Sequence, residues 1–222
     1  MLKWRTALML FAALALPVSA HAYEAWRGPT GLLKHTEEKS FDGYTVLAPL
    51  GSTKTFLIDN DANIINVWES EYRNGSSAIM LPNGHLLRGS TLPREEIAVP
   101  FGGFAGLLEE FDWEGNKVWE LKVNSRKGVF HHGMQRLPNG NTLICSTGSG
   151  QIFEVTPGPQ PRVVWEFVCP WLFDGSIVNY LDDTDVLYST TSHIIKEGHM
   201  KNMIHRVYRY ARDYPAFAGR DL

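Results

Sequence analysis

The chain has 222 residues, 44% of them apolar and 12% aromatic, with a formal net charge of −3. This composition supplies a hydrophobic core and excludes an intrinsically disordered protein. The mildly acidic balance, without a run of Lys and Arg, argues against a nucleic-acid-binding protein.

The N-terminal segment has the pattern of a secretory signal peptide over residues 1–22. Lys3 and Arg5 form a basic start, residues 7–15 are apolar but too short to cross a bilayer, and residues 20–22 form an A-x-A cleavage site. We expect a mature chain of 200 residues with a net charge of −5, from 19 Lys and Arg against 24 Asp and Glu. The mature protein is expected in a periplasm or secreted, with no membrane attachment after cleavage.

Two sequence phrases then alternate, and both predict β-hairpins. The first has an apolar run, a turn of Asn, Asp, Gly or Pro, and a second run ending in Val-Trp-Glu, at residues 56–69, 111–120 and 152–166. The second has Leu-Pro-Asn-Gly between apolar residues, at 80–87 and 136–144. The turn residues supply the positive or fixed φ that a tight hairpin requires.

Two hairpins make one four-stranded sheet, so the alternation predicts an all-β fold of β-propeller-like repeats. Trp68, Trp119 and Trp165 recur 51 and 46 residues apart, close to the roughly 40–50 residues of one propeller blade. The elements expected in chain order are a strand at 44–49, repeats at 53–90, 106–147 and 150–170, a linker at 91–105, and a terminal extension from 206. Residues 23–222 therefore form one domain, a partial or shortened propeller of four-stranded blades.

The strongest candidate for catalysis is the pair His131 and His132, directly before a Leu-Pro-Asn-Gly hairpin. Histidine is the commonest general acid or base and can act as a nucleophile. Arg88 and Arg136, near these phrases in sequence, are candidates for binding an anionic substrate. Two alternatives stay open: the histidines make ordinary strand-end hydrogen bonds, and the arginines are solvated surface residues.

The remaining patterns predict neither a metal nor a cofactor. His193, His199 and His205 are six residues apart, a spacing that fits neither a zincin helix nor a structural zinc site. Residues 59–63 begin like a calcium loop, but the loop's glycine and final glutamate are missing, so a polar hairpin turn is expected. No nucleotide-binding glycine motif is present.

The two cysteines, Cys145 and Cys169, both lie beside strand-like runs. In an oxidising compartment the pair could close a disulfide. Two buried reduced cysteines are an equal alternative, because the sequence does not give the Cα separation that a disulfide requires.

The order of these phrases resembles the bacterial arylsulfotransferase family over most of residues 43–222. The hairpin phrases carry the likeness, together with His131-His132 and the closing Tyr208-Arg209-Tyr210-Ala211, Asp213-Tyr214-Pro215 and Gly219-Arg220-Asp221-Leu222. The resemblance implies a six-bladed periplasmic propeller. In that family a histidine takes a sulfuryl group from an aryl sulfate and passes it to a phenol, while charged side chains stabilise the sulfuryl oxygens.

The chain departs from the family in length and in its site. Six blades need about 270 residues, the family's central phrases Trp-Thr-His-x-Asn, Ser-x-Arg and Gly-Gln-His-Asp have no match, and Gly133 stands where an Asp usually follows the histidine pair.

The expectation is an arylsulfotransferase-like protein in which, if it is competent, His132 or His131 works on an aryl sulfate and a phenol. Arg136 or Arg88 would then bind the sulfate. The alternative is a non-catalytic secreted module that binds a ligand or a protein partner, and a weaker one is a binder of sulfate esters or phenols without turnover. A homodimer of two three-unit chains would complete a six-bladed ring.

Overall fold

The computed structural model describes residues 29–98, 105–125, 128–146, 150–171 and 204–220. Of an N-terminal unit that ends at Lys34 only the last residues are described, and all strands belong to the unit that begins at His35. The predicted signal peptide, His193 and His199 lie outside the described ranges. Within those ranges, no helix is long and apolar enough to cross a membrane.

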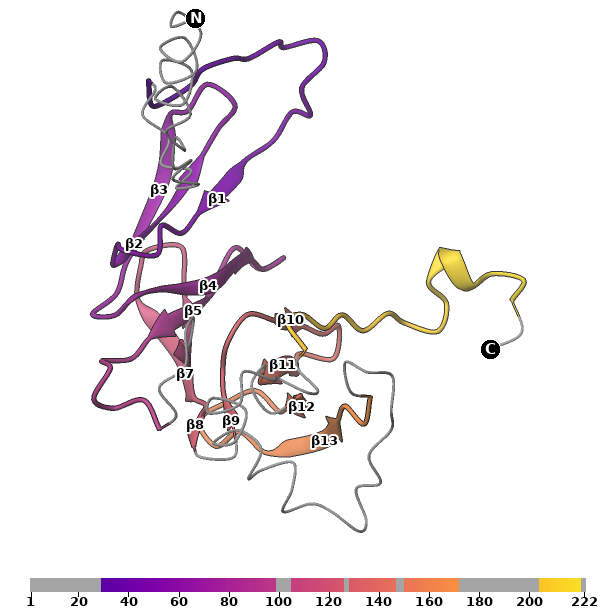
Figure 1. The fold of residues 1–222 in the computed structure, drawn as a ribbon. Coiled ribbons are helices and arrows are strands. Elements are labelled where there is room, and N and C mark those ends of the chain that lie inside the picture. The colour runs from indigo at the N-terminus through magenta and orange to yellow at the C-terminus, as the bar shows by residue number, and fades with distance from the viewer. Residues whose placement is uncertain (1–28, 99–104, 126–127, 147–149, 172–203, 221–222) are drawn as a thin grey trace, which may run out of the picture. The chain divides into compact units, whose positions relative to one another are not determined.

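Three antiparallel sheets follow one another along the chain, and the predicted all-β fold of propeller-like, four-stranded repeats is confirmed (Figure 1). In each sheet every strand pairs with the next one in the chain. The first sheet contains β1 (Thr45–Leu47), β2 (Lys54–Ile58) and β3 (Ile64–Glu69). The second contains β4 (Arg73–Met80), β5 (Leu86–Thr91), β6 (Gly106–Phe111) and β7 (Lys117–Lys122). The third contains β10 (Met134–Arg136), β11 (Thr142–Ser146), β12 (Gln151–Val155) and β13 (Val163–Val168).

Two smaller elements complete the described chain. The hairpin β8 (Asn124–Ser125) and β9 (Gly128–Val129) connects the second and third sheets, and a short 3-10 turn, η2, spans Pro215–Phe217 near the C-terminus. Neither element is predicted by the sequence phrases.

The hairpins combine in a different phase from the one expected. The sequence predicts units that begin with the Trp-ending hairpin, such as residues 53–90, but in each four-stranded sheet the Leu-Pro-Asn-Gly hairpin comes first. The strands on either side of the predicted linker 91–105 are neighbours in the second sheet, because β5 and β6 pair over their whole length. The repeated hairpin phrases give the number of residues per unit. Which hairpins share a sheet depends on the pairing between the strands of successive hairpins, such as β5 with β6.

The turns of the Trp-ending hairpins have one construction in the first two sheets. The Asp112 carboxylate accepts hydrogen bonds from the main-chain and side-chain nitrogens of Asn116 at 2.7 and 2.9 Å, and Asp59 accepts the same pair from Asn63 at 2.8 and 3.0 Å. In both, the side-chain bond from the asparagine is the main cause that lowers the pKa of the aspartate. Residues 59–63 thus form a polar hairpin turn, as the sequence predicts.

The tryptophans of the three hairpins are not all equivalent. Trp119 and Trp165 each lie opposite a glutamate of the preceding strand. Trp68 lies two residues further along its strand relative to the turn, opposite Thr55, and Asn66 takes the position equivalent to Trp119. Trp68 is fully buried, whereas Trp119 is only partly buried against the core.

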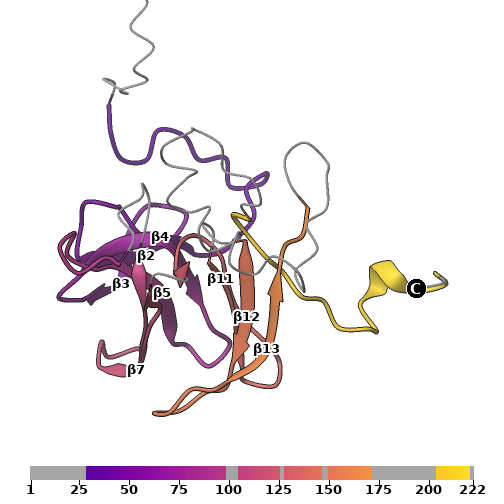
Figure 2. The same cartoon turned by 60° about the horizontal axis from the view of Figure 1, so that its bottom comes forward.

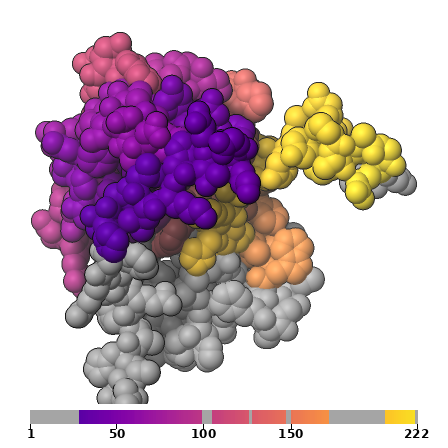
Figure 3. All heavy atoms as spheres, turned by 90° about the horizontal axis from the view of Figure 1, so that it is seen from above, coloured from indigo at the N-terminus to yellow at the C-terminus, as the bar shows by residue number. Residues whose placement is uncertain are grey.

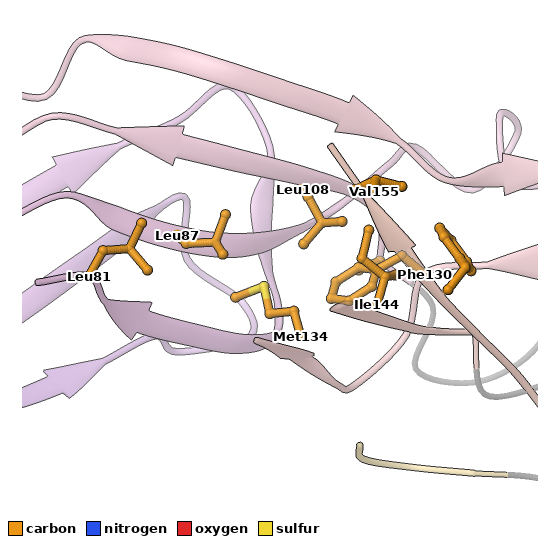
Figure 4. Packing of buried hydrophobic residues seen from close by; sticks show 9 residues of the cluster. Leu81, Leu87, Leu108, Phe130, Met134, Ile144 and Val155 are labelled. Carbon is orange, nitrogen blue, oxygen red and sulfur yellow. The ribbon is translucent and has the colours of Figure 1, made fainter. Parts of the chain in front are cut away.

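The main hydrophobic core joins the second and third sheets (Figure 4). It contains Leu81, Leu87, Ala105, Leu108, Phe130, Met134, Ile144, Phe153 and Val155. The Phe130 ring lies so close to Gly89 that a Cβ there would be 2.5 Å from it, so any larger residue at Gly89 would displace the ring. A second cluster, built around Leu57 and Trp68, joins the first and second sheets.

The two cysteines do not lie on neighbouring strands. Cys145 is on β11 and Cys169 directly follows β13, with β12 between them. Two strand spacings separate their backbones by about 9–10 Å, beyond the roughly 7 Å that a disulfide spans. The Cys145 thiol donates to the Ile204 carbonyl at 2.9 Å and the Cys169 thiol to that of Trp171 at 3.7 Å.

Candidate functional site

A pocket of about 270 Å³ lies beside His132. Three segments form it: β4, the turn into β10, and the terminal segment 204–210. Its lining residues are Ser76, Ser77, Ala78, Ile79, His132, Gly133, Met134, Arg206, Val207 and Tyr208. Among the described residues, the lining contains an imidazole, a guanidinium, a phenol and two hydroxyls but no carboxylate.

Three imidazoles lie together at this pocket. The ring centroids of His131 and His132 are 3.7 Å apart, and those of His132 and His205 are 4.6 Å apart. His131 is buried, with 3% of its surface exposed, so it supports the ring of His132 from the protein side. Nδ1 of His132 is buried and has no hydrogen-bond partner among the described residues. The His132 ring is therefore not committed to a structural hydrogen bond through that nitrogen.

Main-chain contacts of the terminal segment bring Arg206 and Tyr208 to the pocket. The Gln135 side chain donates to the Arg209 carbonyl at 3.2 Å and accepts the Arg209 N–H at 2.7 Å. Figure 2 shows the segment, in yellow, beginning beside the strands of the third sheet. A Cβ on Gly133 would lie 3.0 Å from the Arg206 Cα. The glycine that replaces the aspartate expected from the family resemblance thus allows the terminal segment to approach closely.

Arg88, predicted to bind substrate, is fully buried in a hydrogen-bonded network between the first two sheets. Its guanidinium donates to the Thr53 and Tyr72 carbonyls at 3.0 and 2.8 Å and to the Ser90 hydroxyl at 3.0 Å, and its Nε lies 3.9 Å from the Glu109 carboxylate. Burial lowers its pKa, and the charge of Glu109 partly opposes that effect. These contacts hold Arg88 away from the pocket lining.

Arg136, the second arginine predicted to bind substrate, joins the second and third sheets. It forms an ion pair with Glu110, to which His85 also bonds at 2.8 Å, and its guanidinium lies 5.5 Å from the centre of the Trp119 ring. It does not line the pocket. The structure thus brings together the two predicted histidines but neither predicted arginine, and the positive charge beside His132 comes from Arg206.

A larger hollow of about 560 Å³ lies at the first sheet and has the opposite charge. Its described lining includes the imidazole of His35 and the carboxylates of Glu37, Asp42, Asp59 and Asp61. An anionic ligand is repelled by these carboxylates and favoured by the pocket at His132. Over the described part of the chain, no group of three or more His, Cys, Asp or Glu residues is arranged to hold a metal ion.

Comparisons with known proteins give similarity in structure alone. No protein-family model and no curated protein matches the chain. A protein of unknown function from Bacteroides caccae is 12% identical with a TM-score of 0.37, over 52% of this chain and 38% of its own. BamB from Moraxella catarrhalis is 13% identical with a TM-score of 0.40, over 61% and 37%. The chain thus spans less than two fifths of the length of either protein.

Proposed function

We propose that this protein transfers a sulfuryl group from an aryl sulfate to a phenol, with His132 as the nucleophile. The supporting observation is the pocket in which His132, Arg206 and Tyr208 meet, with no carboxylate among its described lining residues. The resemblance of the sequence to bacterial arylsulfotransferases supplies the reaction class.

The reaction proceeds in two displacements at sulfur. A lone pair on a ring nitrogen of His132 attacks the donor; the N–S bond forms as the S–O bond to the aryl group breaks, and the phenolate leaves with that electron pair. The acceptor oxygen then attacks the same sulfur, the N–S bond breaks, and its electron pair returns to the imidazole. The acceptor's proton ends on the first phenolate, so one phenol and one new aryl sulfate are the products.

Arg206 would stabilise the negative charge on the sulfuryl oxygens. His131 and His205 act on His132 through ring contact and so are positioning residues.

Steady-state turnover of a chromogenic aryl sulfate with a phenol tests the proposal. His132→Ala is expected to abolish phenol-dependent turnover, and Arg206→Ala to lower it by about 10²–10³. Arg212→Ala is the matched control, since Arg212 is exposed on the same terminal region and does not line the pocket. Equal turnover by the wild type and His132→Ala would contradict the proposal.

A second candidate is binding of an aryl sulfate without turnover. The observation that favours it is that no described lining residue offers His132 a carboxylate partner, which would make its ring more basic. Titration calorimetry with a non-hydrolysable aryl sulfonate distinguishes the two. Binding that Arg206→Ala removes, together with no turnover by folded wild type, would favour the binding module.

A further inference from the structure

The first sheet lacks the strand that begins the second sheet. Strand β1 of the first sheet corresponds to β5 of the second. Leu47 of β1 pairs with Phe56, three residues before the turn aspartate of its sheet. Arg88 of β5 pairs with Glu109, which is also three residues before the turn aspartate of its sheet. In the second sheet β4 pairs with the other edge of β5. No strand in the described ranges pairs with that edge of β1.

The terminal segment 204–210 has the contacts of a first strand, and no strand follows it within the described residues 204–220. Arg209 forms an ion pair with Glu154 and lies 4.3 Å from the centre of the Trp165 ring. These contacts reproduce those of Arg136, on the first strand of the third sheet, with Glu110 and Trp119 of the second sheet. Ile204 and Val207 pack on the apolar face of the third sheet formed by Leu137, Leu143 and Ile152. No described strand pairs with this segment.

The two ends of the described chain also present apolar faces. Leu47, Phe56 and Val67 form one row across the first sheet, on the face opposite to the cluster that packs on the second sheet. Leu47 is 41% exposed and Val67 39% exposed. On the third sheet, Val163 and Trp165 are 55% and 41% exposed.

One kind of hydrogen bond joins each sheet to the next. In the described ranges, its donor on the third sheet has no acceptor and its acceptor on the first sheet has no donor. The Asn66 amide donates to the Trp113 carbonyl at 2.8 Å, and the Trp119 indole donates to the Gly158 carbonyl at 3.0 Å. Both bonds run from the last strand of one sheet to the hairpin turn of the next. Trp165 has the same position in the third sheet but no such acceptor among the described residues, and the corresponding turn of the first sheet, at 59–63, receives no such donor there.

We propose that two copies of this chain close one ring, in which the terminal segment of each copy pairs antiparallel with β1 of the other. The contacts that Arg209 shares with Arg136 set the register. Arg136 lies opposite Thr142 in the third sheet, and Thr142 corresponds to Thr45 of the first sheet. Arg209 therefore lies opposite Thr45 of the second copy. In the same antiparallel register, Val207 lies opposite Leu47 of that copy. The Trp165 indole then donates to turn 59–63 of the second copy.

The number of strands supports a second copy over closure within one chain. In the proposed pairing, the terminal segment and the three strands of the first sheet make one complete blade, so the described residues of each chain supply three blades. Propellers contain about 4–8 blades, which excludes a closed ring of three and admits a ring of six. Pairing also covers the open edge of β1, a site at which soluble proteins otherwise aggregate.

Sedimentation of the mature chain over a range of concentrations tests the proposal. A dimer is expected, and Leu47→Glu is expected to yield a folded monomer, because Leu47 is exposed in the single chain. Val118→Glu is the control, since Val118 is 49% exposed on the last strand of the second sheet, away from the proposed contact. A wild type that is monomeric at all concentrations, or that grows into longer oligomers, would overturn the closed dimer.

An engineered disulfide tests the register even if Leu47→Glu fails to fold. The double variant Leu47→Cys/Val207→Cys is expected to form a covalent dimer on oxidation, whereas each single variant and Val118→Cys/Val207→Cys remain monomeric on a non-reducing gel. A disulfide within one chain, or equal cross-linking in the Val118 control, would overturn the proposed pairing.

Discussion

The same contact of an arginine with a glutamate and a tryptophan occurs twice in the chain, and we call it a joint. In the inner joint the arginine belongs to a complete sheet, and in the outer joint it belongs to the terminal segment 204–210. In the inner joint Arg136, from the third sheet, pairs with Glu110 and stacks on Trp119 of the second sheet. The Trp119 indole is also held by the Gly158 carbonyl of the third sheet. The large hydrophobic core of the molecule lies behind this joint.

The outer joint has the same three types of side chain, but fewer buried apolar residues pack beside them. Arg209 pairs with Glu154 and stacks on Trp165, but it belongs to the terminal segment. Beyond it the segment is exposed, as Tyr210 and Tyr214 show at 52% and 44% (Figure 3). The polar contacts of the joint therefore form in full with a single segment, whereas the apolar contacts are reduced to partly buried residues such as Ile204 and Val207.

The largest expected difference between the joints is in their apolar contacts. Phe130→Ala, in the core behind the inner joint, should lower the free energy of unfolding by about 3–5 kcal/mol, because it removes a fully buried ring. Ile204→Ala, a partly buried residue at the outer joint, should cost about 1 kcal/mol. Urea denaturation of both variants measures the two values, and equal losses would contradict the comparison.

The stability losses on removing the two arginines should differ less than those of the apolar residues. Arg136→Ala leaves the nearly buried Glu110 without its main counter-charge and should cost about 2–3 kcal/mol. Arg209→Ala should cost about 1 kcal/mol, since Arg209 is more exposed and Glu154 keeps its bonds from Asn139 and Asn141. Thermal unfolding of both variants gives the order, and a larger loss for Arg209→Ala would show that the outer joint is the stronger one.

The outer joint should also weaken in acid. The side chain of Asn141, followed by those of Asn139 and Arg209, lowers the pKa of Glu154 below its ordinary value of 4.5. A carboxylate with a lowered pKa stabilises the fold above its unfolded pKa, and this contribution is lost as the pH falls through the folded pKa. Proteolysis within 204–220 should therefore accelerate below pH 4.5. Glu154→Gln should flatten that dependence; an unchanged profile would assign it to another group.

The smallest expected effect concerns the indole hydrogen bonds. Trp119→Phe removes the bond to the Gly158 carbonyl and should cost about 0.5–1.5 kcal/mol. Trp165→Phe should cost the isolated chain less, because no acceptor faces the Trp165 indole in the described ranges and a phenyl ring still contacts Arg209. In the proposed ring the same substitution should weaken association of the two copies, because it removes the bond to turn 59–63. Sedimentation of Trp165→Phe measures this effect, and wild-type association would contradict the proposed bond.

The hairpins could be predicted from sequence because each depends on residues close together in the chain. Leu-Pro-Asn-Gly and the Asp59–Asn63 turn contain the side chains that stabilise them. The grouping of hairpins into sheets could not, since the repeat has the same period in either phase. The unequal position of Trp68 has a different origin: the first two hairpins pair with the same offset, but Trp68 follows its turn aspartate by nine residues and Trp119 follows its own by seven. The shared Val-Trp-Glu letters do not record this difference.

The site was predicted only in its local part. His131 and His132 are adjacent in sequence and stand directly before a strand, which is why both could be identified. Arg206 and Tyr208 reach the same pocket through the contact of Gln135 with Arg209, which are 74 residues apart and share no periodic signal. The one available clue was the likeness of Arg209 to Arg136, which becomes visible only when the partners of both arginines are known.

Mass spectrometry of residues 23–222 after brief reaction with an aryl sulfate, quenched without acceptor, tests whether His132 carries the sulfuryl group. We expect one added sulfuryl group on the peptide that contains His132, lost when a phenol is added and absent in His132→Ala. A sulfuryl group on any other peptide, or phenol-dependent turnover with no modified peptide, would contradict the assignment of His132 as the nucleophile.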